Sequence, residues 1–334
     1  MKEALFWEAE ADQRVQCRLC PHGCHIQAGQ RGRCRVRENR DGTLMSLNYG
    51  RVVATHVDPV EKKPLFHYAP GSRCFSFAAM GCNFSCRHCQ NATISQVRGR
   101  IDGDRLMPQH LVAMAEDMRC HSIAYTYTEP TVFYEMVYET AQLASARGID
   151  NLLVSNGFIE EQPLRQVIPF LTAANIDLKS FREDVYRSLC GGRLEPVLQT
   201  LRRLREAEVW LEVTTLVIPG YNDDEQQLAA LTEFIARELG PDTPWHVSAF
   251  FPTYRLTDVP PTPVATLKKA RSIGLAAGLH YVYLGNVPGE AETTHCPQCG
   301  QAVIVRAGYR LQELSVVDGM CSSCETPIAG RLLH

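Results

Sequence analysis

The residues best suited to chemistry in this sequence are Cys82, Cys86 and Cys89, within GCNFSCRHCQN at residues 81–91. Three thiolates in a C-x3-C-x2-C array can hold three irons of a [4Fe–4S] cluster and leave the fourth iron open. A small molecule can chelate such an open iron, whereas a cluster with four cysteines passes electrons. The alternative is a fragment of a zinc knuckle with a distant fourth ligand. The sequence that follows the array favours the cluster.

A second cysteine group lies near the start of the chain, in CRLCPHGCHIQAGQRGRC at residues 17–34. So small a module has little core and would depend on its metal to fold. We expect zinc or a single iron there, with a fully ligated auxiliary iron–sulfur cluster as the alternative. His22 and His25 could each replace a cysteine, although turn and surface roles suit them better. The ligands of this site are Cys17, Cys20, Cys24 and Cys34.

A third group consists of two C-x2-C pairs near the end of the chain, and the sequence AVIVRAGYRLQEL between them alternates like a β-hairpin. Paired cysteines around a hairpin are typical of a structural zinc ribbon. This module would either dock a partner or grip a substrate, or simply stabilise the fold. Its ligands are Cys296, Cys299, Cys321 and Cys324.

Composition places the chain among ordinary globular proteins. It has 334 residues, of which 45% are hydrophobic and 21% charged, and its net charge is −3. This charge argues against a nucleic-acid partner. We find no run of about 18 apolar residues that would indicate a membrane span, and acidic residues interrupt the first fifteen positions where a signal peptide would be apolar. We therefore expect a cytoplasmic protein, in which close cysteine pairs bind metals rather than form disulfides.

Short apolar runs alternate with amphipathic stretches through most of the chain, which predicts parallel βα units. The expected fold is α/β, a partial (β/α)6 TIM-like barrel with its site at the carboxyl ends of the strands. We predict three domains, at 1–70, 71–290 and 291–334, and a small hairpin within 44–57. Strands are expected at 74–80, 122–130, 151–157, 174–180, 209–220, 245–252 and 280–286. Helices are expected at 107–119, 132–147, 160–171, 194–207, 223–239 and 262–277.

Polar residues recur where these strands end, and together they predict a polar mouth. Glu129 could accept from a ligand ammonium, although the Thr128-Glu129-Pro130 sequence also suits a helix start. Asp177 and Lys179 flank a buried leucine, and because unpaired buried charges are costly, both should face the pocket. The other candidates are Ser155, Asn156, Glu212, Thr214, His246 and Tyr254.

Several of these motifs together resemble a known family. The cysteine array, TYTEP, Asp177-Leu178-Lys179 and LVIPGYND look like the pyruvate formate-lyase activating enzyme branch of the radical S-adenosylmethionine (SAM) superfamily. The closer resemblance, which adds CRLCPHGC, YLGNVPG and the terminal CPQCG and CSSC, is to AmmeMemoRadiSam system radical SAM enzymes.

This resemblance implies roles for particular residues. Cys82, Cys86 and Cys89 would bind the cluster, and His88 and Gln90 would lie beside SAM. Thr128 and Glu129 would meet the methionyl amine in place of a Gly-Gly-Glu element. Further SAM contacts would come from Asp177, Leu178 and Lys179, with Tyr254 near a position that is histidine in the activating enzymes.

The resulting hypothesis is reductive cleavage of SAM to methionine and a 5′-deoxyadenosyl radical, which abstracts hydrogen from a substrate. An external reductant, flavodoxin or ferredoxin, would supply the electron, and Memo-type and AMMECR-type proteins are the implied partners. Cys190 is a candidate hydrogen donor. Two alternatives are a glycyl-radical enzyme activating enzyme and a non-catalytic electron-transfer or scaffold protein.

Overall fold

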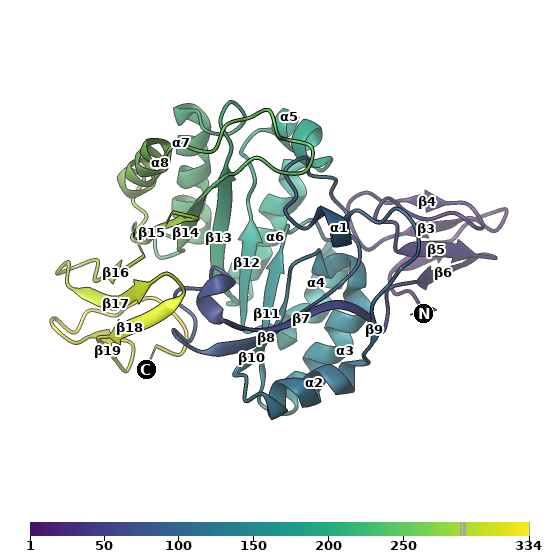
Figure 1. Ribbon diagram of the computed structural model, residues 1–334, viewed down its shortest axis with the longest axis horizontal. Coiled ribbons are helices and arrows are strands. Elements are labelled where there is room, and N and C mark those ends of the chain that lie inside the picture. The colour runs from purple at the N-terminus through teal and green to yellow at the C-terminus, as the bar shows by residue number, and fades with distance from the viewer. Residues whose placement is uncertain (288, 290–291, 334) are drawn as a thin grey trace.

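The computed structural model describes residues 1–287, 289 and 292–333. Pro288 of the YLGNVPG motif and the predicted domain boundary at 290 and 291 lie outside these residues. The core of the fold is a nine-stranded sheet in the order β15-β14-β13-β12-β11-β10-β8-β7-β9 (Figure 1). No helix within the described ranges is long and apolar enough to cross a membrane.

Seven neighbouring strands of this sheet are parallel, and both of their faces are largely buried, which explains their nearly continuous apolar sequences. They are β8 (Arg73–Ala79), β10 (Ser122–Tyr125), β11 (Asp150–Ser155), β12 (Ala173–Asp177), β13 (Trp210–Val217), β14 (Trp245–Ala249) and β15 (Val282–Gly285). Two antiparallel strands, β7 (Arg51–Pro59) and β9 (Asp104–Arg105), complete one edge. All seven predicted strands of the main unit are confirmed.

The helices that connect the parallel strands pack their apolar sides on the sheet. In α6, Val197, Leu201 and Leu204 are fully buried while the arginines of the same helix face outward, the pattern of an amphipathic surface helix. The longer helices are α2 (Pro108–Asp117), α3 (Tyr134–Ser145), α4 (Glu161–Val167), α6 (Leu194–Glu206), α7 (Glu225–Phe234) and α8 (Val264–Ala276). Short elements are α1 (Ala92–Ser95), α5 (Glu183–Val185), η1 (Val60–Lys62), η2 (Pro130–Phe133), η3 (Ile168–Phe170), η4 (Tyr186–Cys190) and η5 (Ile235–Leu239). The six helical segments predicted from the sequence are therefore confirmed.

The sheet differs in detail from the six-unit barrel expected from the sequence. It has seven parallel strands, and β15 and β9 form its two open edges. The predicted hairpin within 44–57 is wrong, because β6 (Thr43–Ser46) pairs with β1 (Lys2–Glu3) and β5 (Arg37–Arg40), whereas β7 pairs with β8. Alternating residues predict a strand but not its partner, so the two strands could not be assigned to separate sheets from the sequence.

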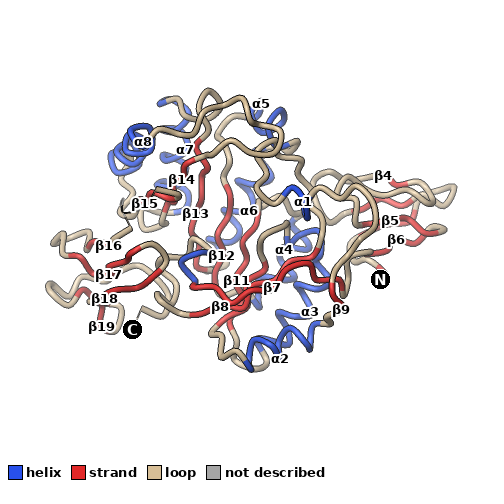
Figure 2. Tube along the Cα trace, viewed as in Figure 1, coloured by secondary structure: helices blue, strands red, loops and turns tan. Residues whose placement is uncertain are grey.

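Two smaller β units lie on opposite sides of the central sheet (Figures 1 and 2). The N-terminal unit contains the β1-β6-β5 sheet and a second sheet of β2 (Trp7–Ala9), β3 (Val15–Cys17) and β4 (His25–Ile26). Buried Arg37 of β5 forms an ion pair with buried Glu135 of α3 and so fixes this unit to the main one. The C-terminal unit contains β16 (Thr294–His295), β17 (Ala302–Ala307), β18 (Arg310–Leu314), β19 (Val316–Val317) and β20 (Met320–Cys321).

The C-terminal unit is anchored on the loop that follows η1. Its β17–β18 hairpin confirms the alternation seen in the sequence. Buried Arg306 contacts the carboxylate of Glu61 at 3.7 Å and donates to the carbonyl of Phe66. His67 donates from Nδ1 to the carbonyl of Ala329 at 2.6 Å and accepts at Nε2 from the Tyr283 hydroxyl at 2.6 Å. A fully buried neutral imidazole therefore bridges the two units.

This bridge predicts a pH-dependent stability. Burial lowers the pKa of His67 to about 4, below the usual value of about 6.5 for an unfolded chain. Between these values the unfolded state binds more protons, so His67 should reduce the free energy of unfolding by about 1.4 kcal/mol for each pH unit of acidification below 6.5. Urea unfolding at several pH values should show that the free energy of unfolding depends less steeply on pH in His67→Asn than in the unaltered protein. The exposed-site control His280→Asn should keep the unaltered slope, and equal slopes for all three proteins would contradict the assignment.

Candidate functional site

A cavity of about 480 Å³ opens where the parallel strands end, within the usual size range of small-molecule sites. It brings together twelve of the residues predicted from the sequence. These are Cys82, Cys86, His88, Cys89, Gln90, Thr128, Glu129, Ser155, Asn156, Asp177, Lys179 and Thr214. The clustering of residues from five separate strand ends makes this cavity the candidate active site.

The three cysteines lie on residues 81–91, which we call the cysteine loop, directly after β8. Donors from the protein surround two of the sulfurs. Cys82 Sγ accepts from the Phe84 amide at 3.3 Å and lies 3.8 Å from Asn156 Nδ2, and Cys89 Sγ lies 3.2 Å from the Ser95 hydroxyl. Such donors stabilise negative charge on sulfur ligands. The donor set therefore fits an anionic iron–thiolate cluster.

His88 gives a second indication of a bound group. Its side chain is buried in the lining, and its Nδ1 atom has no hydrogen-bond partner among the described residues. Burial, with a further contribution from Lys179, lowers the pKa of His88 to about 3, so the ring is neutral. An unpaired buried polar atom is costly, which suggests that a ligand of this cavity supplies the partner.

Glu129 is held in place by donors from three residues. Its Oε1 accepts from the amide and hydroxyl of Thr131 at 2.9 and 2.7 Å and from the Ser155 hydroxyl at 2.7 Å. Its Oε2 accepts from the Asn156 amide at 2.9 Å. Glu129 also caps η2, ahead of Pro130, which confirms the predicted helix start. Because Oε1 accepts three bonds from the described residues and Oε2 only one, Oε2 keeps room for a cationic ligand group.

The Asp177-Leu178-Lys179 triplet behaves as the sequence predicts. Lys179 Nζ lies 2.8 Å from Asp177 Oδ2, and both residues line the cavity, while Leu178 is fully buried between them. Burial works against the charge of Lys179, but Asp177 together with Cys86 and Cys190 outweighs it and holds the pKa of the ammonium well above its usual value. The cavity therefore carries a fixed positive charge beside the cysteines. Leu178 does not line the cavity, which corrects its assignment as a cofactor contact.

Glu212 is also misassigned. Its carboxylate is fully buried and accepts from the amides of Phe66 and His67 and from Trp210 and His246. Glu212 and Thr214 share one face of β13, as two-residue alternation predicts, but only Thr214 is far enough along the strand to reach the cavity. Glu212 instead fixes the loop that carries the C-terminal unit.

Three further candidates lie outside the cavity lining. His246 is buried, donates from Nε2 to the Glu212 carboxylate at 2.6 Å, and lines a neighbouring cavity. Tyr254 lies in the loop after β14 and contacts the Arg255 guanidinium. Cys190 is buried, with its Sγ within 4.8 Å of ligand atoms of Cys86 and His88, behind the cysteine loop. Its position gives no support to the prediction that it donates hydrogen into the cavity.

One wall of the cavity contains a buried ionic cluster that was not predicted from the sequence. Lys63 is almost fully buried, and its Nζ lies 2.6 Å from Asp58 Oδ2 and 3.3 Å from the hydroxyl of Tyr127, which also donates to Asp58. These hydrogen bonds outweigh burial and lower the pKa of Asp58. Adjacent lysines are usually solvated, and the partners of Lys63 come from β7 and from the loop after β10, so no local pattern could reveal the contact.

A second cavity, of about 450 Å³, adjoins the first. Its walls include Phe66, Phe251 and Leu284, and Tyr309 from the turn of the C-terminal hairpin lines both cavities. The two cavities also share Lys62, Pro64, Gln90, Ser248 and Asn286. The candidate site therefore extends from the cysteine loop to the C-terminal unit.

The two other cysteine groups differ in geometry. The sulfurs of Cys296, Cys299, Cys321 and Cys324 all lie within 4.8 Å of one another. The Cys296–Cys324 and Cys299–Cys321 distances are 3.6 and 3.8 Å, close to the separation of thiolates on one tetrahedral ion. Among the described residues, the N-terminal cysteines do not form a group of this compactness. Of these two cysteine groups, the C-terminal one has the geometry of a mononuclear site.

Comparison with known proteins adds to this geometry. A family model described as the Radical SAM superfamily matches residues 78–232, which include the cysteine loop and most of the cavity. The chain therefore contains a radical SAM domain. It also belongs to one family with an uncharacterized protein of Methanocaldococcus jannaschii, to which it is 45% identical over 97% of this chain and 98% of that protein.

Other members are more distant. The pyruvate formate-lyase 1-activating enzyme of Escherichia coli is 24% identical over 51% of this chain and 71% of that enzyme. The crystal structure of a radical SAM methyltransferase from Sphaerobacter thermophilus aligns with a TM-score of 0.51 at 14% identity, covering 67% of this chain and 71% of that one. This radical SAM protein is thus related to the glycyl-radical activating enzymes, and the structural likeness supports the fold.

The hydrogen bonds behind the cysteine loop give a second prediction. Asn156 donates to Asn83 Oδ1 at 2.8 Å and approaches Cys82 Sγ, so Asn156→Ala removes two supports of the loop. Loss of such outer contacts typically weakens metal binding 10- to 100-fold. Iron release to a chelator under anaerobic conditions should therefore be at least tenfold faster in the variant. Asn286→Ala removes an amide that lines the same cavity but donates to Ala249. It should release iron at the unaltered rate, and equal rates for the two variants would refute this role of Asn156.

Proposed function

We propose that this protein is a radical SAM enzyme whose [4Fe–4S] cluster is held by Cys82, Cys86 and Cys89. When bound, the reduced cluster supplies the electron that splits SAM into methionine and a 5′-deoxyadenosyl radical, which abstracts hydrogen from a substrate. The observation that carries the proposal is the meeting of the three cysteines, Glu129 and the Asp177–Lys179 pair in one cavity.

Each part of the cavity suits one part of SAM. The free capacity of Glu129 Oε2 would accept from the methionyl ammonium, and Lys179 would face its carboxylate. Ser155 and Asn156 are fixed by their bonds to Glu129 and Asn83, so they would orient the ligand with little further loss of entropy. Buried walls would shield the reacting atoms from water.

We place the substrate in the second cavity, which opens from the SAM side. Its walls combine the apolar surfaces of Phe66, Phe251 and Leu284 with His246. Tyr309 brings the C-terminal unit to the boundary between the two cavities, which supports a substrate-gripping role for that unit.

The proposed partners rest on the sequence resemblance. Likeness to AmmeMemoRadiSam enzymes supports a small-molecule substrate and joint action with Memo-type and AMMECR-type proteins. Similarity to the pyruvate formate-lyase 1-activating enzyme favours a second candidate, activation of a glycyl-radical enzyme. Both functions use the same SAM chemistry and an external reductant such as flavodoxin, so one first experiment serves both.

That experiment is electron paramagnetic resonance of the anaerobically reconstituted, reduced protein, with and without SAM, followed by an assay for 5′-deoxyadenosine. SAM should change the cluster spectrum and be converted to 5′-deoxyadenosine, because the ligand reaches the open iron. Cys86→Ala should lower this activity at least 100-fold. Cys120 lies outside the cavity, so Cys120→Ala should retain the activity. A spectrum indifferent to SAM and no 5′-deoxyadenosine would favour the electron-transfer or scaffold alternative.

We also propose that the C-terminal cysteines bind zinc and the N-terminal cysteines an auxiliary cluster. The compact C-terminal group suits one tetrahedral ion. In the N-terminal group, the guanidinium of buried Arg37 lies 3.8 Å from Cys17 Sγ, and its Nε has no partner among the described residues. A buried cation beside wider-spaced thiolates suits a cluster, whose cysteines bind different irons.

Metal analysis checks both assignments. The reconstituted protein should contain about eight irons and one zinc per chain, because a [4Fe–4S] cluster holds four irons and a ribbon holds one zinc. Cys17→Ala combined with Cys20→Ala should remove about half of the iron and leave the zinc. Cys321→Ala combined with Cys324→Ala should remove the zinc and leave the iron. About four irons and two zincs in the unaltered protein would instead assign zinc to the N-terminal group.

A further inference from the structure

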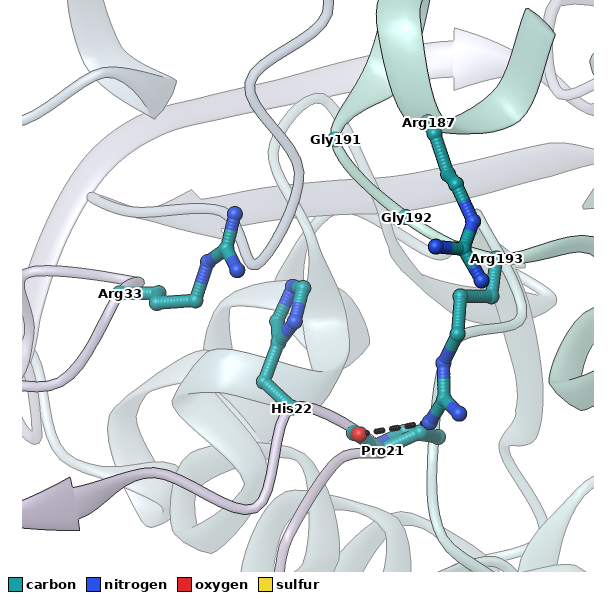
Figure 3. A pocket seen from close by; sticks show the side chains of 7 residues that line it. All are labelled: Pro21, His22, Arg33, Arg187, Gly191, Gly192 and Arg193. Carbon is teal, nitrogen blue, oxygen red and sulfur yellow. Dashed lines mark hydrogen bonds between the residues drawn. The ribbon is translucent and has the colours of Figure 1, made fainter. Parts of the chain in front are cut away.

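A pocket rich in arginine lies outside the candidate active site. It has a volume of about 370 Å³ and is formed where the N-terminal unit meets the segment between η4 and α6. Figure 3 shows Arg33 on one side of His22 and Arg187 and Arg193 on the other. We call it the arginine pocket, and its lining residues are Pro21, His22, Arg33, Arg187, Gly191, Gly192 and Arg193.

The charge of this pocket differs from that of the whole protein. The chain has a net charge of −3, yet none of the described residues that line the pocket is acidic. Arg193 uses one nitrogen to bond the Pro21 carbonyl at 2.9 Å, and the Nε of Arg187 bonds Glu183 at 2.7 Å. All three arginines are exposed. The pocket therefore presents guanidinium groups to solvent in a region of positive potential.

His22 lies in the pocket between Arg33 and the other two arginines. Its Nε2 donates to the carbonyl of Asn83 at 2.8 Å, which ties the N-terminal unit to the cysteine loop. His22 therefore joins the N-terminal side of the pocket to the loop that carries the three cysteines.

The floor of the pocket packs directly on the cysteine loop. The carbonyls of Leu189 and Cys190 accept from the amides of Arg87 and Ser85 at 2.9 and 2.8 Å. A Cβ atom added at Gly192 would lie 2.2 Å from the ring of Phe84, so only glycine allows this close approach. One layer of backbone thus separates the pocket from the loop that carries the three cysteines.

The pocket reaches the cysteine loop from a side that the active-site cavity does not use. The two share no lining residue. A ligand in the arginine pocket would therefore leave the cavity free for SAM and substrate. An electron donor needs a position close to the cluster and an approach from outside the cavity. A reactant, in contrast, must enter the cavity itself.

We propose that the arginine pocket is the docking surface for an acidic one-electron carrier protein, such as a flavodoxin. Complexes of electron carriers are small and transient, and complementary charge speeds their formation. In the complex the carrier loses one electron and the cluster gains one, with no proton or leaving group exchanged at the pocket. This inference rests on the proposed function, because it assumes a redox-active cluster on the cysteine loop.

Charge reversal in the pocket tests the proposal. Formation of 5′-deoxyadenosine is measured with enzymatically reduced flavodoxin and, separately, with reduced methyl viologen, a small cation that needs no basic docking surface. In the triple variant Arg33→Glu, Arg187→Glu and Arg193→Glu, the flavodoxin-driven rate at low salt should fall at least tenfold, because steering is lost. The viologen-driven rate should stay within twofold of the unaltered protein. Raising sodium chloride from 50 to 500 mM should slow only the unaltered protein with flavodoxin.

A matched variant distinguishes the effect of charge in the pocket from the effect of the protein's net charge. Arg119→Glu, Arg147→Glu and Arg310→Glu change the net charge equally at exposed positions away from the pocket, and Arg147 bonds Glu116 at 2.7 Å just as Arg187 bonds Glu183. This variant should keep at least half of the flavodoxin-driven rate. Equal losses in the two variants, or losses with both reductants, would overturn the docking surface.

Failure of the proposed function would give a different result. The unaltered protein would then form no 5′-deoxyadenosine even with methyl viologen. In that case calorimetric titration with oxidised flavodoxin decides the docking proposal separately. Salt-dependent binding that the pocket variant loses and the matched variant keeps would support it, and binding equal in both variants would refute it.

Discussion

The cysteine loop depends on hydrogen bonds from segments that lie behind it, because residues 81–91 form no regular secondary structure. Buried polar groups of such a loop need partners from elsewhere in the chain. Asn83 donates to the carbonyl of Phe158 at 2.7 Å, its Oδ1 accepts from Asn156, and its carbonyl accepts from His22. Ser85 bonds Cys190. Three distant parts of the chain thus position the three thiolates, and the spacing of the cysteines alone would not do so.

The features that sequence predicted well are those with a local cause. Strands and helices followed from periodicity, since burial on both faces gives β8 and β13 apolar runs and burial on one face gives α6 an amphipathic pattern. The orientation of Asp177 and Lys179 followed from two-residue alternation around Leu178. The compact C-terminal cysteine group followed from cysteine spacing, which is also a short-range signal.

The features that sequence missed involve partners far apart in the chain. Glu212 was expected at the cavity, but its carboxylate meets the amides of Phe66 and His67, about 145 residues away in sequence. Lys63 belongs to a pair of adjacent lysines, which are usually solvated, but the tertiary fold closes Asp58 and Tyr127 around it. A strand face could be predicted, whereas the depth of a residue along the strand and the loop that covers it could not. The arginine pocket likewise joins residues from two units.

The two small units line separate cavities on two sides of the cysteine loop. The C-terminal unit reaches the cavity side through Tyr309, and the N-terminal unit reaches the other side through His22 and Arg33. Between these sides the backbone at Gly191 and Gly192 is thin because neither residue has a side chain, and larger residues would collide with Ser85 and Phe84. In the proposed function, an electron would arrive across this thin wall, from the side opposite the cavity in which the radical would form. The same wall would keep a bulky carrier protein away from the substrate, so reduction and hydrogen abstraction need not compete for one entrance.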